Sequence, residues 1–269
     1  MRRGAAPAKI NLALVVGPRR ADGRHELVTL YQRVALSDHL IVSAAPALRV
    51  DGFPEDTLVR RALESVADGD GSFAARIRKR IPVAAGLGGG SSDAATALRL
   101  ANALRAAPLS ESELHARARE LGADVPYFLA DGPQLGTGDG SELEPIELPQ
   151  DYWIVLVLPK GARKSSTGGV YAAFDARGGA RDFDARRAQL LAAIRSVRRS
   201  RDLAGLPAND LASSPLAEEL LRLRAFRADV TGAGAAVYGL FLHGDHARAA
   251  QRRISPKGRT WVTAPAWYR

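Results

Sequence analysis

The sequence predicts an α+β fold, because strand patterns suited to antiparallel pairing occur in the same chain as clusters of helical patterns. Three observations carry this prediction. An alternating strand at residues 7–16 runs into a turn-rich connection, a strand–glycine loop–helix order spans residues 73–104, and a continuous apolar strand covers residues 153–159. A chain of 269 residues is long enough for one large or two modest domains with cores of their own.

The first expected strand, residues 7–16, carries polar residues on one face. Alternation places Ile10 and Leu12 on one side and Lys9 and Asn11 on the other. A lysine and an asparagine two residues apart therefore point the same way, either toward solvent from an edge strand or into a functional site.

Short elements fill the next part of the chain. Residues 17–23 form a turn-rich hairpin connection. Further strands are expected at residues 24–36 and 40–43, and a helix at 56–67 that the Asp-Gly-Asp-Gly run at 68–71 ends.

The glycine loop between a strand at residues 73–81 and a helix at 94–104 is the strongest local signal. Glycines permit positive φ and let backbone amides converge on an anion, and a helix start adds unpaired N–H groups. Ser91 and Ser92 are placed either to cap the helix or to offer hydroxyls to phosphate or metal. A P-loop is excluded because no lysine follows Gly90, and a dinucleotide fingerprint is excluded because position 91 is not glycine.

A second helix is expected to begin at the capping box Ser110–Glu113 and to end at Gly122. Asp124 follows directly and precedes an apolar stretch. This position predicts a rigidly held, partly buried carboxylate, and the alternative is a turn aspartate that bonds its own backbone.

The C-terminal half is expected to begin near residue 150 with the apolar strand at 153–159, buried on both faces. Helices are expected at about residues 165–174, 184–199 and 215–223, and a second glycine turn at 231–235 runs into an apolar strand that reaches residue 241.

Composition limits the classes of function. The net charge of +9 suits anionic partners, either nucleic acid or phosphorylated small molecules, but an aromatic content of 6% is low for an RNA-binding surface. Cysteine is absent, so thiol chemistry is excluded. No apolar run is long enough to span a bilayer and the first residues lack the apolar core of a signal peptide, so a cytoplasmic location is expected.

Three stretches in order, residues 7–11, 82–95 and 231–235, resemble the three motifs of the GHMP small-molecule kinases. Within that superfamily, residues 17–27, 121–126 and 209–211 resemble the 4-diphosphocytidyl-2-C-methyl-D-erythritol kinase family. The resemblance implies a two-lobed GHMP-kinase fold, with a ribosomal-protein-S5-like N-terminal lobe over residues 1–150 and a ferredoxin-like C-terminal lobe over residues 151–269.

The resemblance also implies an activity: transfer of a phosphoryl group from ATP, with Mg²⁺, to the 2-hydroxyl of 4-diphosphocytidyl-2-C-methyl-D-erythritol in non-mevalonate isoprenoid synthesis. The implied partners are small molecules, with no nucleic acid and no membrane. One alternative is another GHMP kinase, of the homoserine or mevalonate type, against which the hairpin at residues 22–25 argues. The other is a non-catalytic, basic nucleic-acid-binding module on the same fold, against which the retained Lys9 and Asp124 argue.

By position, Asp124 would accept the proton of the substrate hydroxyl, and Lys9 would keep Asp124 ionised and stabilise charge on the transferred phosphoryl group. The substrate would be bound by Asn11, Arg24 and His25, with His25 near the cytosine. Arg24 stands where the family usually has a tyrosine, and its planar guanidinium can stack on the base instead. The triphosphate would be bound by Pro82, Val83, Ala84, Ala85, Gly86, Leu87, Gly88, Gly89, Gly90, Ser91 and Ser92, of which Ser92 is also the candidate metal ligand. The third motif contributes a glycine loop beside the active site, Thr231, Gly232, Ala233 and Gly234.

Overall fold

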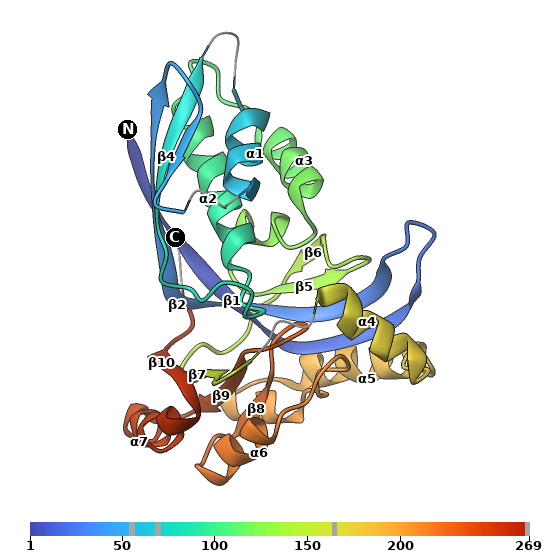
Figure 1. Ribbon diagram of the computed structural model, residues 1–269. Coiled ribbons are helices and arrows are strands. Elements are labelled where there is room, and N and C mark those ends of the chain that lie inside the picture. The colour runs from blue at the N-terminus through green and yellow to red at the C-terminus, as the bar shows by residue number, and fades with distance from the viewer. Residues whose placement is uncertain (54–56, 68–70, 163–165, 267–269) are drawn as a thin grey trace. The chain divides into compact units, whose positions relative to one another are not determined.

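The computed structural model describes residues 1–53, 57–67, 71–162 and 166–266, and the chain forms two compact units (Figure 1). The first unit contains Met1–Ala8, Leu36–Val83 and Gly88–Asp131, and the second contains Lys9–Ala35, Ala84–Leu87 and Gly132–Arg269. Two long paired strands, β1 (Arg2–Arg19) and β2 (His25–Ala45), contribute residues to both units. The α+β prediction is confirmed, and the division into lobes at residue 150 stays a prediction.

The first unit packs helices against a small sheet. Its strands follow the order β3 (Arg49–Asp51), β4 (Ser72–Arg78) and the second part of β2, with β4 antiparallel to β2 and β3 parallel to β4. Its helices are α1 (Thr57–Ser65), α2 (Gly89–Asn102), α3 (Glu111–Leu121) and the short η1 (Pro126–Phe128). The first three contact one another, and α1 and α2 also contact β4 (Figure 1). Asp56, where the predicted helix begins, and residues 68–70 lie outside the described residues.

The prediction of two strands at residues 24–36 and 40–43 was wrong, because β2 is a single strand of 21 residues. Ser37 and Asp38 resemble a break in the sequence but are buried within the strand. The carboxylate of Asp38 accepts the backbone N–H of Ile81 at 2.8 Å and pairs with Lys79 at 2.6 Å. A buried polar residue is tolerated in a strand when its hydrogen-bonding groups are satisfied in this way.

The capping box that was predicted for α3 is present. The Ser110 hydroxyl accepts the backbone N–H of Glu113 at 3.3 Å, and the Glu113 carboxylate accepts the backbone N–H of Ser110 at 2.8 Å. We expect Ser110→Ala to lower the free energy of unfolding by about 1 kcal/mol, because one helix-start amide loses its acceptor. Urea denaturation would measure this, with Ser213→Ala at an exposed position of the second unit as the control, and no change in midpoint would contradict it.

The same capping box should depend on pH. Hydrogen bonds from the Ser110 side chain and backbone hold the pKa of Glu113 below its usual value. The contribution of the Glu113 carboxylate to the stability of the fold is therefore complete above the ordinary pKa of a glutamate. It is lost as pH falls through the lowered pKa of Glu113 in the folded protein.

The second unit contains a four-stranded antiparallel sheet with the strand order β10-β7-β9-β8. The strands are β7 (Trp153–Pro159), β8 (Arg227–Val230), β9 (Val237–Phe241) and β10 (Gly258–Thr263). With helices between β7 and β8 and between β9 and β10, the order fourth, first, third, second is ferredoxin-like. Residues 154–157 of β7 are buried, as their unbroken apolar run predicted, but Trp153 at the start of the strand is exposed. Two helices, α6 (Pro215–Arg222) and α7 (Gly244–Ile254), pack on the sheet through a core that includes Leu220, Phe241 and Ile254.

The remaining elements of the second unit extend β2 and supply helices. The strands β5 (Gln134–Thr137) and β6 (Glu142–Pro145) add to the first part of β2 in the order β2-β5-β6. The other helices are α4 (Thr167–Ala176), α5 (Phe183–Ser196), η2 (Ser200–Gly205) and η3 (Ser255–Lys257). Ser166 caps α4, and Ser165 lies outside the described residues. None of the helices described here has the length and apolar character needed to cross a membrane.

Candidate functional site

Lys9 and Asn11 project from β1 into a buried polar cluster of the second unit. The Lys9 ammonium donates to the Asn11 side-chain oxygen at 2.7 Å, and its nitrogen lies 5.5 Å from the centre of the Tyr31 ring. The Asn11 side-chain nitrogen donates to the Thr29 hydroxyl at 2.7 Å, and the Asn11 backbone N–H donates to the Thr231 hydroxyl at 3.0 Å. Lys9 is only 4% exposed and Asn11 is equally buried, so the polar face of the first strand is not a solvated edge.

The third glycine motif lies against part of the second one within the same unit. The Ala236 backbone N–H donates to the Ala85 carbonyl at 2.9 Å, and the Thr231 hydroxyl lies 3.4 Å from the Gly86 carbonyl. Gly86 has φ +81°, and a Cβ there would lie 2.5 Å from the Thr231 carbonyl oxygen. Only glycine fits at position 86. Because Thr231 contacts both Asn11 of the first motif and Gly86 of the second, the second unit brings together parts of all three sequence motifs.

The start of α2, in the first unit, differs from the prediction. The helix begins at Gly89 with Gly88 as its N-cap, in the left-handed region at φ 68°, and no side chain caps it. Ser91 and Ser92 therefore lie in the first turn instead of capping it, which corrects one predicted role for them. The Ser92 hydroxyl is fully buried and makes no hydrogen bond with any residue that the structure describes. Helix-start amides without a side-chain cap are a suitable environment for phosphate.

An ion-pair cluster next to this helix start was missed by sequence reasoning. Lys79 pairs with Asp38 and with Asp93 of α2, each at 2.6 Å. Burial opposes the charged form of Lys79, but the two carboxylates outweigh it and raise its pKa. The cluster joins β2, the residue that follows β4 and the early part of α2, and thereby fixes where the glycine loop meets its helix.

Asp124 lies in a tight turn between α3 and η1 of the first unit. The Val125 backbone N–H closes the turn onto the Gly122 carbonyl at 3.1 Å, and Val125 and Tyr127 are buried. The Asp124 side chain is itself half-buried, as predicted. Lys9 belongs to the second unit, and the pairing of Lys9 with Asp124 stays a prediction.

His25, at the start of β2, is held by residues of α4. Its Nε2 lies 2.7 Å from the Asp175 carboxylate, and its ring stacks on Tyr171 at 4.8 Å between centroids and meets the edge of Phe174 at 6.0 Å. Sequence reasoning did not select these three residues. Tyr171 and Phe174 lie in the helix that was predicted to end at residue 174, and Asp175 directly follows it. Extending that helix by one residue would have placed Tyr171 and Asp175, which are four residues apart, on the same face.

Arg24 is engaged in an ion pair with Asp139. Burial favours the protonated form of Asp139, but hydrogen bonds from Ser141 and Arg24 hold its pKa below the usual value. The guanidinium of Arg24 is still more than half exposed, so a face of it remains accessible to a ligand.

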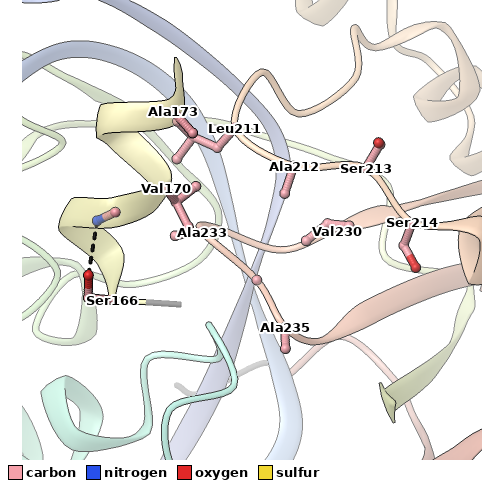
Figure 2. Close-up of a pocket in the computed structure, with 12 residues that line it drawn as sticks. Ser166, Val170, Ala173, Leu211, Ala212, Ser213, Ser214, Val230, Ala233 and Ala235 are labelled. Atoms are coloured by element: carbon pink, nitrogen blue, oxygen red, sulfur yellow. Dashed lines mark hydrogen bonds between the residues drawn. The ribbon is translucent and has the colours of Figure 1, made fainter. Parts of the chain in front are cut away.

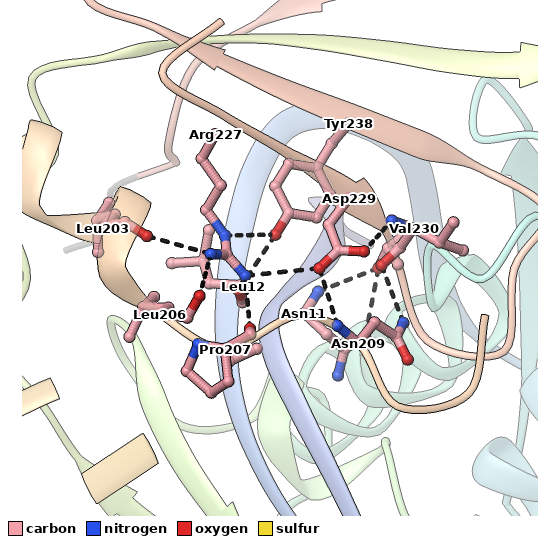
Figure 3. A network of polar contacts seen from close by, with 12 residues as sticks. Asn11, Leu12, Leu203, Leu206, Pro207, Asn209, Arg227, Asp229, Val230 and Tyr238 are labelled. Carbon is pink, nitrogen blue, oxygen red and sulfur yellow. Dashed lines mark hydrogen bonds and ion pairs between the residues drawn. The ribbon is translucent and has the colours of Figure 1, made fainter. Parts of the chain in front are cut away.

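A buried arginine organises the polar interior of the second unit (Figure 3). Arg227 donates to the Tyr238 hydroxyl at 3.1 Å and lies 3.5 Å from the Asp229 carboxylate. It also donates to the carbonyls of Leu12, Leu203, Leu206 and Pro207. Burial raises the pKa of Tyr238 to about 12, so its neutral hydroxyl can donate to the Leu12 carbonyl while accepting from Arg227.

Asn209 connects this network to the third glycine motif (Figure 3). Its side-chain nitrogen donates to the Val230 carbonyl at 2.9 Å and to the Gly232 carbonyl at 2.7 Å, and its backbone N–H donates to Asp229 at 2.9 Å. The Asn-Asp-Leu segment at residues 209–211 therefore fixes the shape of the glycine loop. The aspartate of this segment, Asp210, accepts the Val16 backbone N–H at 2.8 Å and forms an ion pair with Arg186.

The third glycine motif also borders a cavity of about 560 Å³ (Figure 2). Figure 2 shows α4 on one side of it and the strand end Val230 with the glycine loop on the other. The lining is made mostly of small side chains, namely Ser166, Gly169, Val170, Ala173, Leu211, Ala212, Ser213, Ser214, Val230, Ala233, Gly234 and Ala235. Two of the three serines in this lining, Ser166 and Ser214, cap helices of the second unit.

The comparisons with known proteins all indicate the same family. Residues 57–132 match the model of the GHMP kinases N terminal domain. The chain is 34% identical to the 4-diphosphocytidyl-2-C-methyl-D-erythritol kinase of Pelodictyon phaeoclathratiforme, over 97% of this chain and 96% of the relative. It is 38% identical to the enzyme of the same name from Chlorobium phaeobacteroides, over 87% of each chain.

Solved structures agree with the sequence comparison. A crystal structure of 4-(cytidine 5'-diphospho)-2C-methyl-D-erythritol kinase superimposes with a TM-score of 0.79 at 32% identity, over 98% of this chain and all of that one. A mevalonate kinase superimposes with a TM-score of 0.71 at 12% identity, over 98% of this chain and 99% of the other, which shows a shared fold only.

Proposed function

Because this chain belongs to the 4-diphosphocytidyl-2-C-methyl-D-erythritol kinase family of GHMP kinases, we propose that it phosphorylates the 2-hydroxyl of that cytidine-linked alcohol with ATP. The observation that carries the proposal is identity of 34% along essentially the whole length of a relative bearing that name. The reaction would supply a phosphorylated intermediate to non-mevalonate isoprenoid synthesis. The partners would be two small molecules, ATP and the alcohol, with no nucleic acid.

The triphosphate of ATP would be bound by the glycine loop of residues 82–92. The uncapped start of α2 at Gly88 offers backbone N–H groups and the positive end of a helix dipole to phosphate oxygens. Lys79 is bound to two carboxylates, so its charge fixes the loop rather than adding to the phosphate site. The site would thus rely on the backbone amides of the loop and of the helix start.

Asp124 and Lys9 would carry the chemistry. Phosphoryl transfer depends on positioning and electrostatic stabilisation, with a carboxylate that orients and deprotonates the nucleophile. Asp124 would accept the proton from the 2-hydroxyl as the oxygen attacks the γ-phosphorus. Lys9, held by Asn11, would present a positive charge to the transferred group.

Mg²⁺ would neutralise charge on the phosphates when bound. The buried Ser92 hydroxyl, which has no hydrogen-bond partner among the described residues, is a suitable oxygen ligand for such a hard cation. Ser92 would hold the metal next to the helix start that binds the phosphates.

The role of Arg24 can be tested by substitution. We expect Arg24→Ala to raise KM for the cytidine substrate by about 2- to 30-fold and Arg24→Tyr to retain it, because either a guanidinium plane or an aromatic ring can cover the base. Steady-state kinetics would measure both. If Arg24→Lys retained KM and Arg24→Tyr did not, the charge of Arg24 would be its contribution, and stacking would be excluded.

A panel of alcohol acceptors tests the proposed function. We expect kcat/KM for 4-diphosphocytidyl-2-C-methyl-D-erythritol to exceed that for homoserine or mevalonate by several orders of magnitude. Preference for one of the smaller alcohols would assign the chain to another GHMP activity. Absence of ATP turnover with every acceptor, together with binding to nucleic acid, would favour a non-catalytic module on the same fold.

A further inference from the structure

The side-chain amide of Asn11 is held in one orientation by hydrogen bonds at both of its ends. The Thr29 hydroxyl donates its proton to the Ala13 carbonyl at 2.9 Å. A hydroxyl has a single proton, so toward Asn11 the Thr29 oxygen can only accept, and it receives the Asn11 side-chain nitrogen at 2.7 Å. At the other end Lys9, whose ammonium can only donate, donates to the Asn11 oxygen at 2.7 Å. A flipped amide would set a donor against the ammonium and an acceptor against the hydroxyl, and both hydrogen bonds would be lost.

The Thr29 side chain is itself fixed on β2. It is fully buried, and its methyl group lies over Gly136 of β5, where an added Cβ would be 3.2 Å from Thr29 Cγ2. With the methyl group on that side, the hydroxyl reaches β1. Tyr31 is two residues further along β2 and so on the same face, and the centre of its ring lies 5.5 Å from the Lys9 nitrogen. The strand β2 therefore supports both members of the Lys9–Asn11 pair.

The oxygen end of the Asn11 amide also meets the third glycine motif. The Thr231 hydroxyl accepts the Asn11 backbone N–H at 3.0 Å and lies 3.3 Å from the Asn11 side-chain oxygen. The oxygen thus faces two donors, Lys9 and Thr231, while Thr29 accepts from the nitrogen. Because Asn11 is only 4% exposed, bulk water cannot replace a lost partner.

We propose that Thr29 is a positioning residue of the phosphoryl transfer. Its hydroxyl sets the orientation of the Asn11 amide, and the amide oxygen in turn holds the Lys9 ammonium in place. The inference rests on the proposed function, in which Lys9 stabilises charge on the transferred group. Such stabilisation depends on a charge that is already in position when the reaction begins, so a residue that orients the support of Lys9 contributes to the rate.

The competing explanation gives Thr29 a structural role only. Its hydroxyl would then serve the Ala13 carbonyl, and the contacts with Thr231 would be enough to hold Asn11. Loss of the hydroxyl would lower stability without acting on Lys9. The two explanations therefore differ in whether the effect of a change at Thr29 depends on Asn11.

Thr29→Val is the informative variant, because valine has nearly the shape of threonine but no hydroxyl. We expect kcat to fall by about 10- to 100-fold, since the ammonium is no longer held in its position. KM for ATP should change by less than about twofold, because the glycine loop and the start of α2 bind the triphosphate in the proposed function. Thr29→Ser keeps the donor and the acceptor of the hydroxyl and should restore kcat to within about threefold of the wild-type value.

A double-mutant cycle shows whether Thr29 acts through Asn11. Asn11→Ala should remove the same support of Lys9, so adding Thr29→Val to it should lower kcat by less than about twofold more. Effects that multiply in full would overturn the proposal. Thr263→Val removes a threonine hydroxyl from another buried position of the second unit, in β10, and is the control that should leave kcat unchanged.

Carbon-13 relaxation of the Lys9 Cε methylene group tests the structural part without substrate, and a Lys9→Arg variant assigns the signal. The group should be rigid in the wild-type protein and in Thr29→Ser, and it should gain fast motion in Thr29→Val and in Asn11→Ala. A mobile Lys9 side chain in the wild-type protein would overturn the proposal, as would unchanged rigidity in a folded Thr29→Val variant. If the wild-type protein failed to phosphorylate the cytidine-linked alcohol, the proposed function and the kinetic role of Thr29 would both be refuted. The relaxation result would still decide whether Thr29 holds Lys9.

Discussion

Replacing Asp124 by asparagine is expected to lower kcat by about 10²- to 10⁴-fold, the usual contribution of a positioned acid–base group. The amide has the shape of the carboxylate but cannot accept the proton of the substrate hydroxyl. KM for both substrates should change little, because the turn closed by Val125 and Gly122 does not depend on the side-chain charge. Single-turnover measurements would show whether the chemical step itself is slowed.

Glu120→Gln is the matched control for Asp124→Asn. It removes one negative charge from an exposed position of α3 in the same unit. Its kcat should stay within about twofold of the wild-type value. Near-normal turnover by Asp124→Asn would remove the general-base role from this residue.

Replacing Arg227 by methionine is expected to lower the free energy of unfolding by about 3–5 kcal/mol, the typical cost of breaking a buried ion pair by removing one partner. Methionine fills part of the volume but leaves the Asp229 charge without its partner. It also removes the guanidinium donor from the carbonyls of Leu206 and Pro207 and from that of Leu12, which keeps the Tyr238 hydroxyl as a donor (Figure 3). Urea denaturation at neutral pH would measure the change.

The loss of unfolding free energy in Arg227→Met should grow with rising pH. Burial raises the pKa of Asp229, and Arg227 opposes that shift. A carboxyl group whose pKa is raised in the folded state makes the folded protein less stable as pH rises above the pKa of that group in the unfolded chain. Removal of Arg227 should raise the pKa of Asp229 in the folded protein further and so widen the pH range over which stability is lost. Arg199→Met, at an exposed position, is the control, and a pH-independent loss would contradict the assignment of the effect to Asp229.

The parts of the fold that sequence predicted correctly depend on local patterns. The capping box of Ser110 and Glu113 and the buried run of β7 need no information from distant residues. The glycine motifs were also recognisable one at a time. Their meeting, through Thr231, Asn11 and Gly86, is a tertiary result that the resemblance implied and single-stretch patterns could not supply.

The missed features depend on partners far apart in the chain. The continuous β2 required that Asp38 find the amide of Ile81 and the ammonium of Lys79, both about forty residues away. The burial of Arg227 depends on carbonyls from several segments, and a sequence pattern shows only a charged residue in a short strand. His25 and Asp175 are 150 residues apart, so their contact could not be read from the neighbours of either residue in sequence.

The most direct test of the proposed activity is to follow the γ-phosphoryl group of labelled ATP into product. With 4-diphosphocytidyl-2-C-methyl-D-erythritol and Mg²⁺ present, we predict one labelled phosphoryl group transferred for each ADP released, attached to the 2-hydroxyl as located by phosphorus–carbon coupling in the NMR spectrum. Without the alcohol, ADP should not accumulate. Label on a different hydroxyl, or ADP release that does not require the cytidine-linked alcohol, would contradict the proposed function.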